Sequence, residues 1–159
     1  MAWTYTTLTQ AIKDYANTSE TTFSNNIKNF IESAEERILR TCQLPVFRKN
    51  VEGNMSQGTQ YLATPSDYLS PFSLSITSSN KQDFLLLKEV AFLREAYPDA
   101  SSEGAPKYYA LFDNDTFILA PTPNQSYVTE LHYFYRPPSI TETSDGKSWL
   151  GTNAPECLL

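Results

Sequence analysis

The sequence predicts an α+β fold in which an N-terminal helical pair packs on a mostly antiparallel β domain with one short inserted helix. Two observations support this class. Apolar residues recur at spacings of three and four over the first 41 residues, which is the period of a helix. From about residue 46 onward, short apolar or alternating runs are separated by turn residues, which is typical of strands and hairpins.

The length of 159 residues predicts one main domain, large enough to bury a core without disulfides or metals. We divide it into a helical part, residues 1–45, and a β-rich part, residues 46–159, as one integrated domain. The formal net charge of −6 argues against wrapping of the DNA backbone, which needs clustered Lys and Arg. Since no apolar run approaches the roughly 20 residues that cross a bilayer, no membrane contact is expected.

Two helices are predicted in the N-terminal part. The first is expected near residues 6–16, with Thr7 as its N-cap and Gln10 as the capping-box partner. The second is expected near residues 22–41 and is ended by the proline that follows. Glu35 falls on its polar side. The apolar face that should enter the core holds Phe23, Ile27, Phe30, Ile31, Ala34 and Ile38.

The β-rich part is predicted as strands joined by turns. Residues 46–55 and 59–63 flank a Ser-Gln-Gly turn and are expected to pair as a hairpin. The run "YVTELHYFYRPP" is the longest predicted strand. Two further hairpins and the inserted helix are expected over residues 72–87, 107–121 and 88–98, respectively.

Helix-start signals recur near the C-terminus. Asn153 is a favourable N-cap, Pro155 suits the first turn, and Glu156 suits the third helical position. Three residues follow Glu156. We therefore expect a C-terminal helix that starts near residue 153 and is cut short.

No catalytic, cofactor or metal site is predicted. His132, the single histidine, lies in a predicted strand, and the sequence has no Gly-x-Ser-x-Gly motif that would supply a nucleophile for it. A zinc site with Cys42 and Cys157 lacks ligand spacing. Asp113 and Asp115 suit a hairpin turn, because the glycine and distal glutamate of a calcium loop are missing.

Basic and aromatic residues are the candidates for binding. Arg37, Arg40, Arg48 and Lys49 are interleaved with glutamates, which favours a solvated, partly paired face over an interface for an acidic partner. The chain has ten Tyr and nine Phe. In the last predicted strand both faces carry aromatic residues, so one face is available for a protein contact, in which Tyr is enriched. The predicted subunit or tail contacts are Tyr133, Tyr135 and Arg136.

Several segments together are similar to one known family. The helix "FIESAEERILR" followed by "LPVFRKNVEG", then "YLATPSDYLSPFSLSI", "REAYP", "PKYYALFDNDTFILAPTP" and "ELHYFYRPPSI", resembles the head-to-tail adaptor family of tailed bacteriophages. The similarity runs in order from about residue 4 to residue 155. None of these motifs carries chemistry, so the resemblance depends on their order and spacing.

The resemblance implies a structural role in the virion neck, at the head–tail junction. Such a protein is expected to form a homo-oligomeric, twelve-fold ring that binds the portal protein on one side and tail or nozzle proteins on the other. DNA would pass through the ring without sequence-specific binding, and assembly would take place in the host cytoplasm. Neither enzymatic activity nor a cofactor is expected. The alternative from the residues alone is a soluble carbohydrate- or protein-binding module of a tail or fibre.

Overall fold

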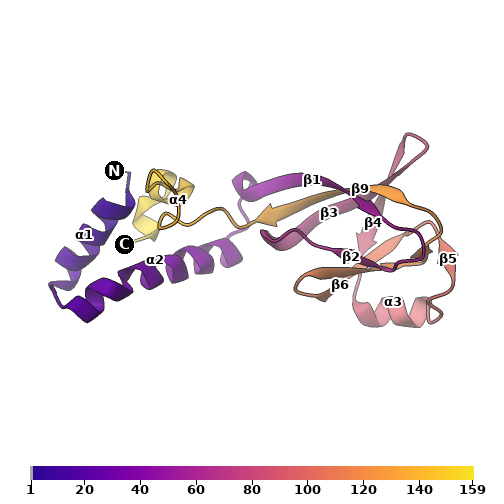
Figure 1. Ribbon diagram of the computed structural model, residues 1–159, viewed down its shortest axis with the longest axis horizontal. Helices are drawn as coiled ribbons and strands as arrows, with labels where there is room; N and C mark the ends of the chain where they lie inside the picture. Colours follow the sequence, from indigo (N-terminus) through magenta and orange to yellow (C-terminus); the bar gives the residue numbers. More distant parts are fainter. Residues whose placement is uncertain (1) are drawn as a thin grey trace. The chain divides into compact units, whose positions relative to one another are not determined.

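The computed structural model describes residues 2–159, which divide into two compact units. One unit combines the N-terminal residues up to Gln43 with Pro137–Leu159, and the other is Leu44–Arg136. The first contains the long helices and the second contains a mostly antiparallel sheet (Figure 1). This content confirms the predicted α+β class. The C-terminal segment, however, belongs to the same unit as the N-terminal helices.

Helix α1 (Tyr5–Ala16) starts earlier than predicted and has a different cap. Thr4 is the N-cap, and its Oγ1 accepts a hydrogen bond of 3.2 Å from the backbone N–H of Thr7. The Thr7 hydroxyl oxygen in turn accepts a hydrogen bond of 2.9 Å from the backbone N–H of Thr4. The capping box is therefore Thr4–Thr7 rather than Thr7–Gln10, because a second threonine at the third helical position can close it as a glutamine would.

Helix α2 (Thr21–Thr41) has a narrower buried stripe than predicted. Ile27 and Ile31 are buried as expected, but Phe30 is 51% exposed and packs on Phe23 at a ring distance of 5.8 Å. The stripe continues through Glu35 and Leu39, so its members follow a strict spacing of four. The prediction of Phe30 as a core residue was wrong because a spacing of three placed the face too far around the helix.

Burial of Glu35 is explained by its contact with the C-terminal segment. The Glu35 Oε1 accepts the backbone N–H of Ile140 at 3.2 Å, and the Glu32 Oε1 accepts the hydroxyl of Thr141 at 2.6 Å. Within the described chain, Oε2 of Glu35 has no hydrogen-bond partner. These two carboxylates therefore fix Ile140 and Thr141 on α2.

Replacement of Glu35 should separate its hydrogen bond from its charge. Glu35→Gln keeps an oxygen that can accept from Ile140, so we expect the free energy of unfolding to change by less than about 1 kcal/mol. Glu35→Ala leaves the buried N–H unsatisfied and should cost about 1–3 kcal/mol. Urea unfolding of both variants measures the difference. Equal losses would contradict a role for the hydrogen bond.

The C-terminal helix begins before the predicted position. Helix α4 spans Trp149–Asn153, and the Ser148 Oγ accepts the backbone N–H of Gly151 at 3.1 Å as its N-cap. Asn153 is thus the last residue of a helix and not the first. A 3-10 turn, η2 (Pro155–Cys157), then starts at the predicted proline. The helix ends before Pro155 because proline disfavours helical backbone in the residue that precedes it.

The β-rich unit is built on a seven-stranded sheet in the described chain, with the order β1-β9-β3-β4-β6-β7-β2. All neighbours are antiparallel except β4 and β6, which are parallel and connected through helix α3 (Val90–Ala96). A 3-10 turn, η1 (Pro45–Phe47), leads into this sheet, and β5 (Glu103–Gly104) and β8 (Thr122–Pro123) form a small separate pair. The strands of the sheet are β1 (Arg48–Met55), β2 (Tyr61–Ala63), β3 (Tyr68–Ser78), β4 (Lys81–Leu87), β6 (Tyr108–Asp113), β7 (Thr116–Ala120) and β9 (Tyr127–Tyr135).

Strand pairing agrees with the prediction for two hairpins and differs for one. The β3–β4 and β6–β7 hairpins and helix α3 are confirmed. Strands β1 and β2, predicted as a hairpin, do not pair: β1 pairs with β9 and β2 pairs with β7. The turn residues 56–58 are present, but they separate the strands instead of joining them in register. Strand β3, with 11 residues, is longer than β9, with nine.

The core of the β-rich unit lies between the inner faces of the curled sheet. Aromatic rings meet edge to face there, with Phe117 5.4 Å from both Tyr68 and Tyr109. On the other side of β6 and β7, helix α3 covers a smaller cluster of Leu93, Ala110, Ile118 and Ala120. The main core comprises Met55, Leu74, Ile76, Leu85, Tyr109, Phe117, Leu119, Tyr127, Leu131 and Tyr133.

Candidate interaction surface

An arginine lies over two aromatic rings on the outer face of β1, β3 and β9. The guanidinium carbon of Arg48 is 4.0 Å from the ring centroid of Phe72 and 5.2 Å from that of Phe134. The Phe72 ring also contacts His132 edge to face at 4.9 Å. We call Arg48, Phe72, His132 and Phe134 the arginine–aromatic cluster. Register explains it, because Arg48 is directly opposite Phe134 in the β1–β9 pair.

The arginine–aromatic cluster has the chemistry of a protein-binding anchor. Phe72 remains 49% exposed although it supports a cation on its face. In the described residues, the Arg48 Nε is buried and has no hydrogen-bond partner. Arginine and large aromatics dominate the energetics of protein interfaces. Since this Nε is covered by the protein, a carboxylate on a partner surface would have to bind the terminal nitrogens of the guanidinium.

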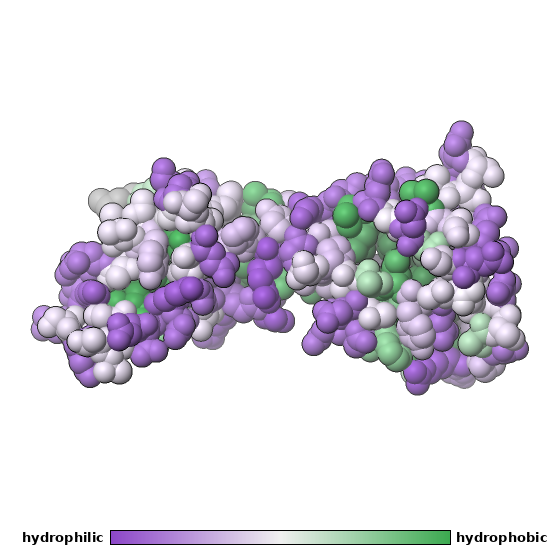
Figure 2. Space-filling model, in the orientation of Figure 1, coloured by the Kyte–Doolittle hydropathy of each residue, from purple (hydrophilic) through white to green (hydrophobic). Residues whose placement is uncertain are grey.

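A polar network stiffens the same face beside the cluster. Glu130 of β9 accepts hydrogen bonds from the side-chain amides of Asn50 and Gln82, which come from β1 and β4. Gln82 also donates to the Ser75 hydroxyl at 2.8 Å. Phe84, opposite Ser75 in the β3–β4 pair, is largely exposed. Apolar patches among hydrophilic residues are visible on the β-rich unit in Figure 2.

The three predicted contact residues lie at the end of β9 in different environments. Tyr133 is buried in the core, and its hydroxyl donates to the Asp67 Oδ1 at 2.7 Å. Tyr135 is half-buried, with the ammonium of Lys49 5.7 Å from its ring centroid. Arg136 is exposed. Tyr133 therefore supports the sheet, and Tyr135 and Arg136 are the members of the set that a partner can reach. Their assignment as contacts stays a prediction.

Asp67 joins the core tyrosine to a surface cation. Burial alone would raise the pKa of Asp67, but hydrogen bonds from Lys49 Nζ, at 2.8 Å, and from Tyr133 hold this pKa below its ordinary value. Burial, together with the hydrogen bond to Asp67, raises the pKa of Tyr133, which stays a neutral donor. A carboxylate with a depressed pKa stabilises the fold above its unfolded pKa, and that stability is lost as the pH falls through the folded pKa.

Asp67→Asn should therefore reduce stability at neutral pH more than in acid. We expect a loss of about 1 kcal/mol at pH 7, kept small because the Lys49–Asp67 pair is partly solvated. The difference from the parent chain should shrink as the pH falls from the ordinary pKa of an Asp side chain through the lower pKa of Asp67 in the folded state. Urea unfolding over a series of pH values from neutral to acid tests this, and a pH-independent difference would contradict the ionic contribution.

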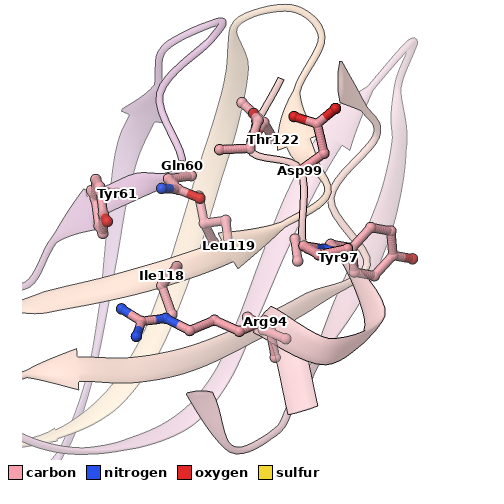
Figure 3. A pocket seen from close by; sticks show the side chains of 12 residues that line it. Gln60, Tyr61, Arg94, Tyr97, Asp99, Ile118, Leu119 and Thr122 are labelled. Carbon is pink, nitrogen blue, oxygen red and sulfur yellow. The ribbon is translucent and has the colours of Figure 1, made fainter. Parts of the chain in front are cut away.

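A pocket of about 270 Å³ lies beside helix α3. Ile118 and Leu119 of β7 lie centrally among its lining residues, and the side chain of Arg94 reaches toward them from α3 (Figure 3). Gln60 and Tyr61 line it from the start of β2. The guanidinium of Arg94 lies 5.7 Å from the ring centroid of Phe112. The lining of this pocket therefore mixes apolar side chains with polar and charged ones, among them Arg94 and Asp99.

The other candidates from the sequence fall into ordinary structural positions. Asp113 accepts the backbone N–H of Asp115 at 2.9 Å, as expected for the β6–β7 turn. Cys42 and Cys157 are exposed free thiols. Across residues 2–159, no three His, Cys, Asp or Glu side chains are grouped so that they could hold a metal ion. No helix in that range is both long and apolar enough to span a membrane.

The predicted basic residues are divided between the two units. Arg40 pairs with Glu36 on α2, in the helical unit, whereas Arg48 and Lys49 belong to the β-rich unit. Sequence reasoning also missed Phe72, which follows Pro71 in β3. Its contact with Arg48 spans 24 positions of sequence and follows from the shared neighbour β9, so no local pattern could have indicated it.

Comparison with known proteins identifies the class. Residues 3–159 match the family model described as SU10 adaptor protein, so the chain belongs to the SU10 adaptor family. This membership makes it a phage adaptor-type protein. A search of curated proteins found no match.

Proposed function

We propose that this protein is a non-enzymatic subunit of a homo-oligomeric, twelve-fold ring that joins the portal protein to tail or nozzle proteins. The observation that carries the proposal is the family match over residues 3–159. Ring closure requires one surface patch to bind a different patch on the next copy. The arginine–aromatic cluster and the nearby Arg136 offer such a patch to an acidic neighbour.

The charge of the chain supports a place around the DNA path. A formal net charge of −6 on each copy gives a ring of identical subunits a strongly negative character. Like charge repels the duplex, so DNA can pass without adhering to the wall. In this proposal the protein occupies the virion neck and binds no nucleic-acid sequence.

The proposal is tested by assembly with the portal protein and by a reconstruction of the virion neck. Mass photometry of the mixture should show discrete ring-sized species, and density for this chain should lie between portal and tail. Density for this chain in a fibre tip, or a monomer that binds a glycan, would contradict the adaptor proposal. Either result would favour a binding module of the tail or fibre.

A pair of charge reversals tests the contact surface. Arg136→Glu should lower the yield of ring-sized species, whereas Lys81→Glu should leave it unchanged. Lys81 is also an exposed cation of the β-rich unit, but it lies at the β3–β4 turn, where it pairs with Asp83. Thermal melts of both variants control for folding. Equal yields from the two variants would remove Arg136 from the contact.

A further inference from the structure

The sheet of the β-rich unit ends at two strands that have one free edge each. Strands β1 and β2 are the outermost in the sheet order, and within residues 2–159 no strand pairs with their outer edges. Together they line a groove of about 490 Å³, which also includes Thr129 and Leu131 of β9. We call this groove the β1–β2 seam. The two outermost strands of the curled sheet therefore line one groove and are not paired with each other.

Backbone hydrogen bonds show which groups of β2 face the β1–β2 seam. The N–H of Leu119 donates to the carbonyl of Gln60, and the N–H of Thr64 donates to the carbonyl of Asp115, both at 2.8 Å. Because alternate residues of a strand direct these groups to opposite sides, Tyr61 and Ala63 point theirs away from β7. An unpaired edge of this kind is a template for an extended peptide.

Side chains along the seam define what such a peptide must carry. Gly53, opposite Thr129, has no side chain, and a Cβ built there would lie 3.2 Å from the Thr129 Oγ1. Val51 and Leu62 beside it are half-buried against the core. An apolar side chain of the occupant would therefore enter the seam near Gly53. Glu52 is exposed and forms no ion pair among the described residues, so it can receive a cation.

We propose that the β1–β2 seam binds an extended segment of a partner protein in which apolar residues alternate with Lys or Arg. The period of two along a strand directs the apolar side chains inward and the cations toward Glu52. The acidic balance of the whole chain favours the same basic occupant. This proposal does not depend on ring formation, because it concerns a site within one subunit.

Binding of two synthetic peptides tests the charge and the site together. The probes are Ac-KVKVKVK-NH2 and Ac-EVEVEVE-NH2, titrated by calorimetry and followed by amide hydrogen exchange of the full chain. The basic peptide should bind and slow exchange at Tyr61 and Ala63. The acidic peptide should bind about tenfold more weakly, since cation attraction to Glu52 is replaced by repulsion.

Two substitutions locate the site. Glu52→Lys should reverse the preference between the peptides, whereas Glu95→Lys, an exposed reversal on α3 outside the seam, should not. Gly53→Val should abolish binding by filling the seam. The proposal fails if neither peptide slows exchange at Tyr61 and Ala63, or if Glu52→Lys leaves the preference unchanged. The proposal also fails if the protein self-associates, if neither peptide competes with that self-association, and if Gly53→Val disrupts it. The occupant of the seam would then be a second copy of this chain.

Discussion

Ile31→Ala should lower the free energy of unfolding by about 2–5 kcal/mol, the range for truncation of a buried isoleucine. Ile31 is 2% exposed and lies at the middle of the buried stripe of α2. Loss of its side chain removes apolar contacts and leaves a cavity. The packed helix can relax only partly into this cavity, so part of the cost remains. Urea unfolding, followed by circular dichroism, measures the change through the midpoint and the slope.

Phe30→Ala is the matched control for this position. Phe30 directly precedes Ile31 on the same helix and has a larger side chain. If side-chain size alone set the loss of stability, Phe30→Ala would be the more destabilising substitution. Because it is half exposed, its truncation should cost less than about 1 kcal/mol. A loss equal to that of Ile31→Ala would contradict the position of the buried stripe.

Phe117→Ala should destabilise the β-rich unit by about 3–5 kcal/mol. The side chain is fully buried, and its ring is the shared partner of two edge-to-face contacts, with Tyr68 and Tyr109. Aromatic pairs contribute beyond the area that they bury. The loss should be visible in the near-ultraviolet signal of the tyrosines as well as in the unfolding midpoint.

Phe84→Ala makes the same chemical change on the outer face of the sheet. Phe84 is 63% exposed, so we expect a change within about 0.5 kcal/mol. The comparison holds residue type and β context constant and varies burial. Similar losses from both phenylalanines would show that the inner face has been assigned to the wrong side of the sheet.

Elements set by local patterns were predictable from the sequence. The predicted helices 6–16 and 22–41 correspond to α1 and α2 within one residue at each end. Periodicity and the proline after α2 supply these limits without any tertiary information. The β6–β7 hairpin was likewise predictable, because its Asp-Asn-Asp turn is a local signal.

Features that depend on distant partners were not predictable in this way. The turn after β1 resembles a hairpin turn, but β1 gains a full-length antiparallel partner in β9, some 80 positions away in the sequence. Likewise, Glu35 looks like a polar surface residue until Ile140 brings an N–H to it. Local propensity predicts neither contact, because β9 and Ile140 are far in sequence from the residues that they bind.

For the candidate contact surface too, the local pattern was not sufficient to show which face of the strand is buried. Alternation correctly put Tyr133 and Tyr135 on one face of β9 and Phe134 on the other, but both faces carry aromatic residues. The choice of inner face depends on the strands stacked against it. Since Tyr133 lies in the core, the accessible anchor on the opposite face is the arginine–aromatic cluster, which the period alone could not single out.

The division of the chain has a consequence for the order of its synthesis. Leu44–Arg136 is continuous, so the β-rich unit has all of its residues once Arg136 has been added. The helical unit requires Pro137–Leu159, including the Ile140 backbone that Glu35 binds. Units generally fold as they emerge during translation. Packing of the helical unit is therefore completed after the β-rich unit has all of its residues, because the backbone N–H that Glu35 binds is added to the chain only then.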